Sequence, residues 1–85
     1  MTVQDFDNVL VELSNTYVAK NADYGDSFHE SVREFGLLAG LVRIGDKYNR
    51  LKSLLTKKDQ KVKDESIRDT LLDMANYCIM LSLEL

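Results

Sequence analysis

Four oxygen-bearing side chains recur at helical spacing in the segment ESIRDTLLDMANY, residues 65–77. They are Glu65, Asp69, Asp73 and Asn76, separated by four, four and three positions. On a helix that turns about 100° per residue, the last three lie about 40°, 80° and 20° from Glu65, so all four share one side. Mg²⁺ prefers oxygen ligands and binds through one or two carboxylates together with water and substrate phosphates. The row is therefore a candidate magnesium site, in which Asn76 could orient a ligand or its base.

The same row has a simpler interpretation as the solvated face of an amphipathic helix. An apolar stripe lies on nearly the opposite side and consists of Ile67, Leu71, Met74, Cys78 and Leu81. Cys78 is expected to be buried there as a small apolar side chain, not to act as a nucleophile. Met80 and Leu83, however, continue the acidic row, so this side becomes apolar within two turns. Such a side is expected to be covered by another segment, and covered carboxylates need cations or donors to offset their desolvation.

A basic segment earlier in the chain, RIGDKYNR, supplies candidate partners for the acidic row. Its basic residues are Arg43, Lys47 and Arg50. If the chain forms a helical hairpin about the charged connector at 56–63, Asp46 lies level with Asp73. Asp46 would then add a metal ligand, while the basic side chains hold phosphate oxygens. The structural alternative is that Asp46 pairs with Arg50 one turn away and the basic side chains bridge to the next helix.

A third candidate feature is the segment KNADYGDSF, residues 20–28. Tyr24 and Phe28 are candidates to stack on a base, and Lys20 is a candidate to neutralise phosphate charge. Ser27 is expected to cap a helix, because Glu30 three residues later completes a capping-box pattern. A helix N-terminus offers free N–H groups to an anion, but such a stretch is also typical of a plain interhelical turn with two aromatic anchors. His29 is interpreted as a surface residue.

The elements that must position these side chains are helices. The chain has 85 residues, of which 45% are hydrophobic and none is proline, and its apolar residues recur at helical spacing. We expect an all-α, three-helix up-down bundle with helices at about 3–20, 27–55 and 64–85. The long second helix is apolar on two sides, with one seam running from Leu37 to Leu55. A chain of this length buries only roughly 60% of its unfolded surface, so we expect the core to be completed by oligomerisation.

The composition also restricts the partners. The net charge of −3 gives no basis for direct nucleic-acid binding. No apolar run approaches the length of a membrane span, and the N-terminus lacks the features of a signal peptide. The single cysteine cannot form an internal disulfide. The sequence therefore predicts a cytoplasmic domain that does not bind membranes.

Three stretches in this order, KNADYGDSF, RIGDKYNRLKSLL and ESIRDTLLDMANY, resemble the nucleotide-modification-associated domain family of phage and bacterial genomes. The resemblance covers about residues 17–80 and implies a small all-α protein with a nucleotide-related role. The helical layout is also similar, at the level of fold, to the MazG-like all-α nucleoside triphosphate pyrophosphohydrolases. Those enzymes hold Mg²⁺ with an ExxE-type pair on one helix and an ExxD-type pair on the next. Here Glu65 and Asp69 have ExxxD spacing, and Asp46 stands alone on the preceding helix.

The sequence thus yields two hypotheses. The first is a nucleotide-binding domain of phage or bacterial nucleotide metabolism, with Mg²⁺-dependent pyrophosphohydrolysis as the candidate reaction, acting as a dimer or tetramer on a nucleotide or modified nucleotide. Its candidate metal ligands are Asp46, Glu65, Asp69 and Asp73. Its candidate substrate contacts are Lys20, Tyr24, Phe28, Arg43, Lys47, Arg50 and Asn76. The second hypothesis is a non-enzymatic helical oligomerisation module in which the acidic and basic rows form structural salt bridges.

Overall fold

The computed structural model describes residues 1–24, 26–56 and 63–85, apart from the side chains at 23, 24, 63 and 64. Within these ranges the chain forms four α-helices and no strand: α1 (Val3–Tyr24), α2 (Ser27–Phe35), α3 (Leu37–Thr56) and α4 (Lys63–Ser82). The all-α prediction is confirmed, but the predicted number of three helices is wrong. No helix in this described part of the chain is both long and apolar enough to cross a membrane.

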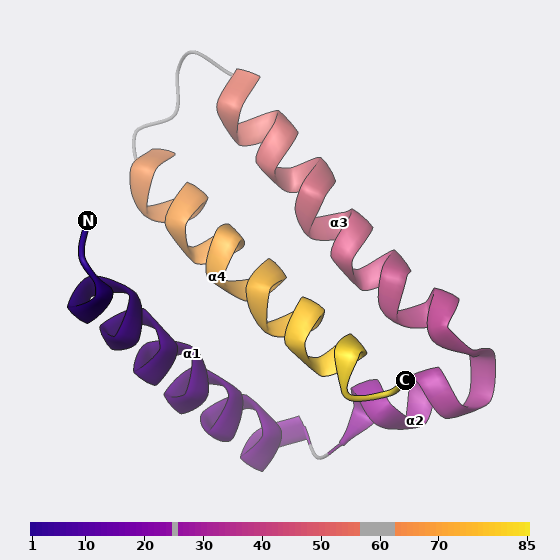
Figure 1. Ribbon diagram of the computed structural model, residues 1–85. Coiled ribbons are helices and arrows are strands. Elements are labelled where there is room, and N and C mark those ends of the chain that lie inside the picture. Colours follow the sequence, from indigo (N-terminus) through magenta and orange to yellow (C-terminus); the bar gives the residue numbers. More distant parts are fainter. Residues whose placement is uncertain (25, 57–62) are drawn as a thin grey trace.

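The predicted second helix is broken at Gly36. This residue has φ 87° and ψ 179°, a backbone conformation that residues with a Cβ rarely adopt. Its N–H donates to the carbonyl oxygen of Val32 at 2.7 Å and so closes the last turn of α2. The chain then changes direction, and α2 lies across the end of the other helices (Figure 1). The break divides the predicted helix at 27–55 and turns Phe28 and Val32 into the core, where both are buried.

The three longer helices lie side by side, with α4 between α1 and α3 (Figure 1). On one side of α4, Arg50 Nε donates to Thr70 Oγ1 at 3.2 Å, and Lys47 Nζ lies 3.4 Å from Asp73 Oδ2. The hairpin of α3 and α4 therefore has a register within one residue of the predicted one, which set Asp46 level with Asp73. On the other side of α4, the contacts with α1 include the ion pair of Lys20 with Asp73 and the hydrogen bond from Asn76 Nδ2 to the backbone oxygen of Leu13.

The apolar core is small. Among the described residues, the buried hydrophobic ones are Leu13, Phe28, Val32, Leu51 and Leu54, and the buried polar one is Thr70. Gly40 allows the closest packing, because a Cβ added there would lie 2.5 Å from Leu81 Cδ1 and 3.0 Å from Phe28 Cζ. Gly40 thus permits close helix packing, whereas Gly36 has the separate role of breaking the helix.

The structure also corrects two local predictions. Asp26, not Ser27, is the N-cap of α2, and its side chain forms no capping hydrogen bond. In α4, Cys78 is exposed and Leu71 is 50% exposed, so the predicted buried stripe is displaced. The covered side of α4 lies toward Thr70, Asp73 and Tyr77, because α4 packs between two neighbours and turns this side inward.

Candidate functional site

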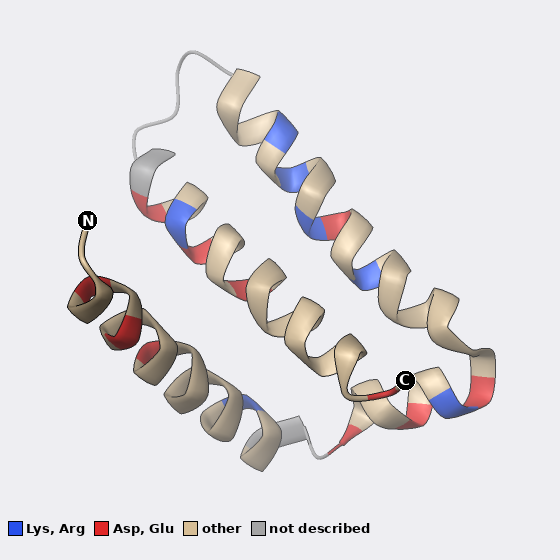
Figure 2. Cartoon of the chain, in the orientation of Figure 1, with Lys and Arg blue, Asp and Glu red and all other residues tan. Residues whose placement is uncertain are grey.

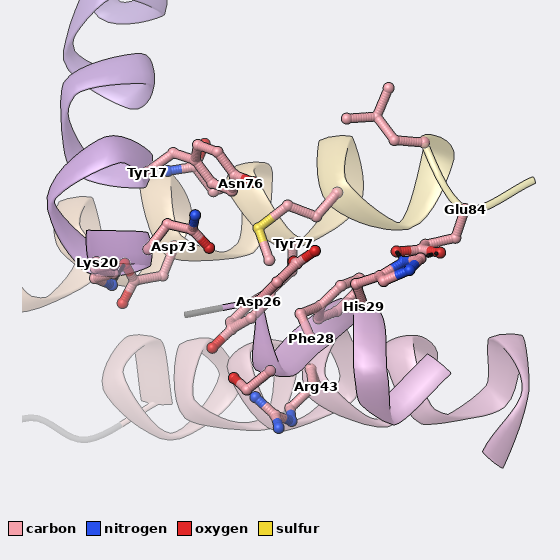
Figure 3. A pocket seen from close by; sticks show the side chains of 14 residues that line it. Tyr17, Lys20, Asp26, Phe28, His29, Arg43, Asp73, Asn76, Tyr77 and Glu84 are labelled. Atoms are coloured by element: carbon pink, nitrogen blue, oxygen red, sulfur yellow. Dashed lines mark hydrogen bonds and ion pairs between the residues drawn. The ribbon is translucent and has the colours of Figure 1, made fainter. Parts of the chain in front are cut away.

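A pocket of about 720 Å³ lies among α1, α2 and α4 and is also lined by Arg43 of α3. Figure 3 shows Lys20 and Asp73 on one side of it and His29 and Glu84 on the other, with the rings of Phe28 and Tyr77 between them. The helix α1 contributes residues to this pocket although it is only loosely attached to α4. The pocket therefore depends on how α1 is held against the α3–α4 hairpin.

Asp73 joins three helices at this pocket. Its Oδ1 accepts a hydrogen bond from Lys20 Nζ of α1 at 2.8 Å, and its Oδ2 lies 3.4 Å from Lys47 Nζ of α3. The carboxylate side chain is only 26% exposed. Its desolvation raises the pKa of Asp73, but the hydrogen bond and charge of Lys20 and the charge of Lys47 outweigh this cost, and the net pKa lies below its ordinary value. Asp73 is thus ionised and paired with two cations at neutral pH.

The aromatic lining comes from three helices. Phe28 of α2 stacks on Tyr77 of α4, with ring centroids 5.8 Å apart and planes at 30°. Phe28 is buried, so one of the two rings predicted to stack on a base already packs against a protein ring. The other predicted ring, Tyr24, has a side chain outside the described part of the structure. Tyr17 of α1 lines the pocket as well and is 40% exposed, which makes it a more accessible ring than Phe28.

The far side of the pocket is closed by an interaction that sequence reasoning missed. Nδ1 of His29 lies 2.7 Å and 2.9 Å from the two carboxylate oxygens of Glu84. The side chain of Glu84 is only 14% exposed, whereas that of His29 is 42% exposed. The interpretation of His29 as a surface residue is therefore only partly right. The two residues are 55 positions apart, and no local spacing signals their contact.

Of the remaining predicted substrate contacts, some line the pocket and others lie between packed helices. Arg43 lines the pocket. Asn76 also lines it, while its Nδ2 donates to the backbone oxygen of Leu13 at 3.2 Å and so ties α4 to α1. Arg50 donates to Thr70 and lies in the α3–α4 interface. Lys47 is not among the described residues that line the pocket, but its Nζ lies 3.4 Å from Oδ2 of Asp73, which does.

The four predicted metal ligands do not all lie in the pocket. Glu65 and Asp69, which share a side of α4 with Asp73, are exposed, and so is Asp46 on α3. Among the residues that the structure describes, no group of three or more His, Cys, Asp and Glu side chains could hold a metal ion. Asp73 is the member of the predicted set that lies in the pocket, and both of its oxygens face a lysine.

Two further lining residues, Tyr17 and Tyr77, were not predicted as site residues. Tyr17 belongs to the apolar stripe of the first helix, and a ring on such a stripe is expected to be buried in the core. Tyr77 follows Asn76 directly and carries no spacing signal of its own. Both rings line the pocket, which lies among α1, α2 and α4 beside the hydrogen bond from Lys20 to Asp73.

The fold and the pocket together define a small all-α domain with a ligand-sized, partly aromatic and partly charged cavity. Residues 20–85 match the family model of nucleotide modification associated domain 1, and the chain belongs to that family. The match begins at Lys20, so it includes α2, α3 and α4, while Tyr17 and Leu13 of α1 precede it. No curated protein and no solved structure matches the chain. The name of the family associates the chain with nucleotide modification.

Proposed function

We propose that the chain binds a nucleotide or modified nucleotide in the pocket among α1, α2 and α4. The observation that carries this proposal is the placement of the Lys20–Asp73–Lys47 group beside aromatic rings in one pocket of about 720 Å³. Pockets for small ligands usually have volumes of about 300–1,000 Å³, with few polar groups among apolar and aromatic ones. A nucleotide presents the matching combination of an aromatic base and an anionic phosphate. The association of the family with nucleotide modification supports the same ligand class.

The phosphate is assigned to the side of the pocket that carries Lys20, and Arg43 is its second candidate contact. Lys47 also lies against Asp73, so the carboxylate keeps a cation when Lys20 donates to a phosphate. The base is assigned to Tyr17 and Tyr77, because Phe28 is buried against Tyr77. Stacking on an aromatic ring tolerates different bases, and this suits a modified nucleotide as well as an ordinary one.

Mg²⁺-dependent pyrophosphohydrolysis, which the MazG-like resemblance implies, is the finer form of this proposal. The donor set as arranged does not fit Mg²⁺, because each oxygen of Asp73 faces a lysine and Asp46, Glu65 and Asp69 are exposed. A dependence of nucleotide binding on Mg²⁺ would require these carboxylates to rearrange, and the titrations below measure it directly. The proposed setting is phage or bacterial nucleotide metabolism in the cytoplasm, with the chain acting as a homo-oligomer.

A non-enzymatic helical oligomerisation module is the second candidate. It is favoured by the ion pairs between helices, since Arg68 holds Glu12 through two hydrogen bonds of 2.7 Å and Lys20 holds Asp73. In such a module these pairs would only hold α1 against α4. The two candidates differ in what Lys20 does beyond this attachment.

Isothermal titration with nucleoside monophosphates, deoxynucleotides and triphosphates, with and without Mg²⁺, tests the proposal. Lys20→Met should weaken the binding of the best ligand on the order of tenfold to a hundredfold, because a charge-assisted hydrogen bond to phosphate is lost. Arg68→Met is the matched control, since it also breaks an ion pair between α1 and α4 but lies outside the pocket lining. An equal loss in both variants would mean that Lys20 acts only by attaching α1. The absence of binding by every nucleotide tested would leave the module as the better explanation.

A further inference from the structure

We infer that two copies of the chain associate through the outer face of α3, in an antiparallel crossing centred on Gly45. We call this surface the α3 outer face. It is formed by Leu38, Leu41, Val42, Gly45, Tyr48, Asn49 and Lys52. This inference does not depend on nucleotide binding, because the seven residues of this face do not line the pocket.

The accessible surface area of the chain is larger than that expected for a compact monomer of the same mass. Its accessible surface is 6551 Å², whereas a monomer of 9.7 kDa is expected to expose about 5,100 Å². Its radius of gyration is 14.3 Å, against about 12 Å for a compact chain of this length. The excess of about 1,400 Å² is larger than the roughly 800 Å² that each partner buries in a standard interface. The excess of the whole chain, to which α1 also contributes with exposed side chains such as Phe6 and Val18, is thus of the size that one dimer interface buries.

The α3 outer face concentrates exposed apolar side chains. Leu38, Leu41, Val42 and Tyr48 are each more than half exposed. They point away from the side of α3 that carries Lys47, Arg50 and Leu51 toward α4, as expected from a rotation of about 100° per residue. Phe35 at the end of α2, which is 71% exposed, extends the same surface, and a shallow groove lined by Phe35, Leu38 and Val42 lies on it. Lys52 is the cation on this face, and its Nζ lies 5.3 Å from the ring centroid of Tyr48.

Gly45 lies in the middle of this face. The packing of the described residues does not explain why this position is a glycine. A Cβ added there would meet no atom within 4 Å. A glycine inside a helix costs about 0.5–1 kcal/mol relative to alanine, and the contrasting Gly40 is explained by its contact with Leu81. Small residues on exposed helix faces let a second helix approach closely. Gly45 thus supplies the point of closest approach for a second copy.

The face is self-complementary when α3 of a second copy runs antiparallel with Gly45 opposite Gly45. Residues whose numbers add to ninety then face one another, so Leu38 lies opposite the aliphatic stem of Lys52, Leu41 opposite Asn49, and Val42 opposite Tyr48. Phe35 and Leu55, both exposed, extend the contact at the ends. A parallel arrangement would instead set Lys52 against Lys52, and like charges in contact are unfavourable. A two-fold interface of this kind closes as a dimer.

The charged and aromatic groups of the pocket stay outside this interface, except Arg43, which also lines the groove beside Leu38 and Val42. They come from α1, α2 and α4, and Arg43 is the residue that α3 contributes to the pocket lining. Figure 2 shows α4 and α1 on the other side of the molecule from the outer surface of α3. Disruption of the dimer and loss of nucleotide binding are therefore separable results.

Light scattering and sedimentation equilibrium of the full chain test the interface. The native chain should have twice the mass of one chain, and Leu41→Glu should raise the dimer dissociation constant on the order of a hundredfold, because a charge is placed in the centre of the contact. The matched control is Val11→Glu on α1, where the side chain is 60% exposed on a different surface. This variant should remain a dimer with unchanged affinity.

A second test does not depend on the folding of a charged variant. In a Cys78→Ser background, which removes the one natural thiol, Gly45→Cys should form an intermolecular disulfide under mild oxidation. The Cα atoms of a disulfide usually lie about 4.4–6.8 Å apart, and the proposed crossing, with Gly45 opposite Gly45, would allow this distance. Val11→Cys in the same background should not cross-link efficiently.

Three results would overturn the inference. The first is a native chain that stays monomeric at the highest concentration used for nucleotide titration. The second is a Val11→Glu variant that dissociates while Leu41→Glu remains dimeric. The third is cross-linking at position 11 but not at position 45. A Leu41→Glu variant that is monomeric, retains its helical circular dichroism and still binds nucleotide would support both the interface and its independence from the pocket.

Discussion

The two neighbours of α4 contact it through different chemistry. On the side of α3, the buried residues Leu51 and Leu54 and the close approach at Gly40 form an apolar contact. On the side of α1, the contacts include the ion pairs of Arg68 with Glu12 and of Lys20 with Asp73. In addition, Asn76 Nδ2 donates a hydrogen bond to the backbone oxygen of Leu13. Leu13 is the buried apolar side chain of α1.

Because of this difference, the α3 side of α4 mainly stabilises the fold, whereas the α1 side carries the candidate pocket. Apolar burial stabilises the α3–α4 hairpin by about 25 cal/mol for each Å² removed from water and is insensitive to salt. Ion pairs contribute less, fall with ionic strength, and can exchange partners with a ligand. Figure 2 shows that α1 carries mainly acidic residues along its first turns while α3 is mainly basic. The candidate pocket lies on the polar side, where α1 can adjust without disturbing the core.

The largest expected effect is on the apolar side. Leu51→Ala removes most of a buried leucine and should lower the free energy of unfolding by about 2–4 kcal/mol, through lost burial and the cavity left behind. Urea unfolding followed by circular dichroism measures the change. Protection of the α3 and α4 amides from hydrogen exchange should fall together with the global stability.

Leu13→Ala is the matched comparison, because Leu13 and Leu51 are buried to a similar extent, with exposed fractions of 7% and 8%. If α1 is the more weakly attached element, this variant should speed exchange mainly in α1 and leave protection in α3 and α4 nearly unchanged. Equal loss of protection in all helices of both variants would contradict the division between the two sides of α4.

A smaller effect is expected at the covered ion pair. Asp73→Asn keeps the shape of the side chain but leaves Lys20 and Lys47 without their carboxylate, and it should cost about 1–2 kcal/mol of unfolding free energy. Glu12→Gln, which breaks the exposed pair with Arg68, should not change the urea midpoint measurably, because solvent screens that pair. If the two variants were equally destabilised, the burial of Asp73 would have no energetic consequence.

The pH dependence of stability separates Asp73 from the exposed groups. Because Lys20 and Lys47 hold the pKa of Asp73 below its ordinary value despite desolvation, its contribution is fully present above the unfolded pKa of about 3.9 and is lost as the pH falls through the lower folded value. The stability difference between the native chain and Asp73→Asn should therefore be constant near neutral pH and shrink below about pH 4. The pKa of Glu12 is also lowered, by its hydrogen bond with Arg68, but both proteins share this group and its effect cancels. A difference that grows on acidification would contradict the assigned pairing.

The sequence predicted the hairpin well because its signals are local. Apolar periodicity places the end of α3 and both ends of α4 within a few residues of their observed bounds, and the charged connector sets their register, but the start of α3 at Leu37 lies inside the helix predicted at 27–55. The break at Gly36 was missed because glycine is tolerated inside helices, and only the positive φ adopted in the folded chain distinguishes Gly36 from Gly45. The rotation of α4 was misjudged because α4 has two neighbours, and apolar periodicity assumes that one face is covered.

The candidate site was predicted only in part, for a related reason. Lys20, Phe28, Arg43, Asp73 and Asn76 do line the pocket. Contacts such as His29 with Glu84 and Lys20 with Asp73 join residues more than fifty positions apart, and the spacing within a helix carries no information about them. The position of α1 determines which carboxylate of the acidic row is covered, and α1 is attached by those same long-range pairs.

The smallest effect on stability, and the sharpest test of the rotation of α4, is expected at Cys78. The sequence pattern predicts this thiol inside the core, whereas the structure exposes it on the side of α4 that neither α1 nor α3 covers. Cys78→Ser should change the free energy of unfolding by no more than about 0.5 kcal/mol, as expected for an exposed site. The native thiol should react with a disulfide reagent in one fast phase, at a rate close to that in urea, because reaction needs no unfolding. A reaction that proceeds only as fast as the chain unfolds would mean that α4 is rotated toward the predicted stripe, which would remove Asp73 from its position between the two lysines.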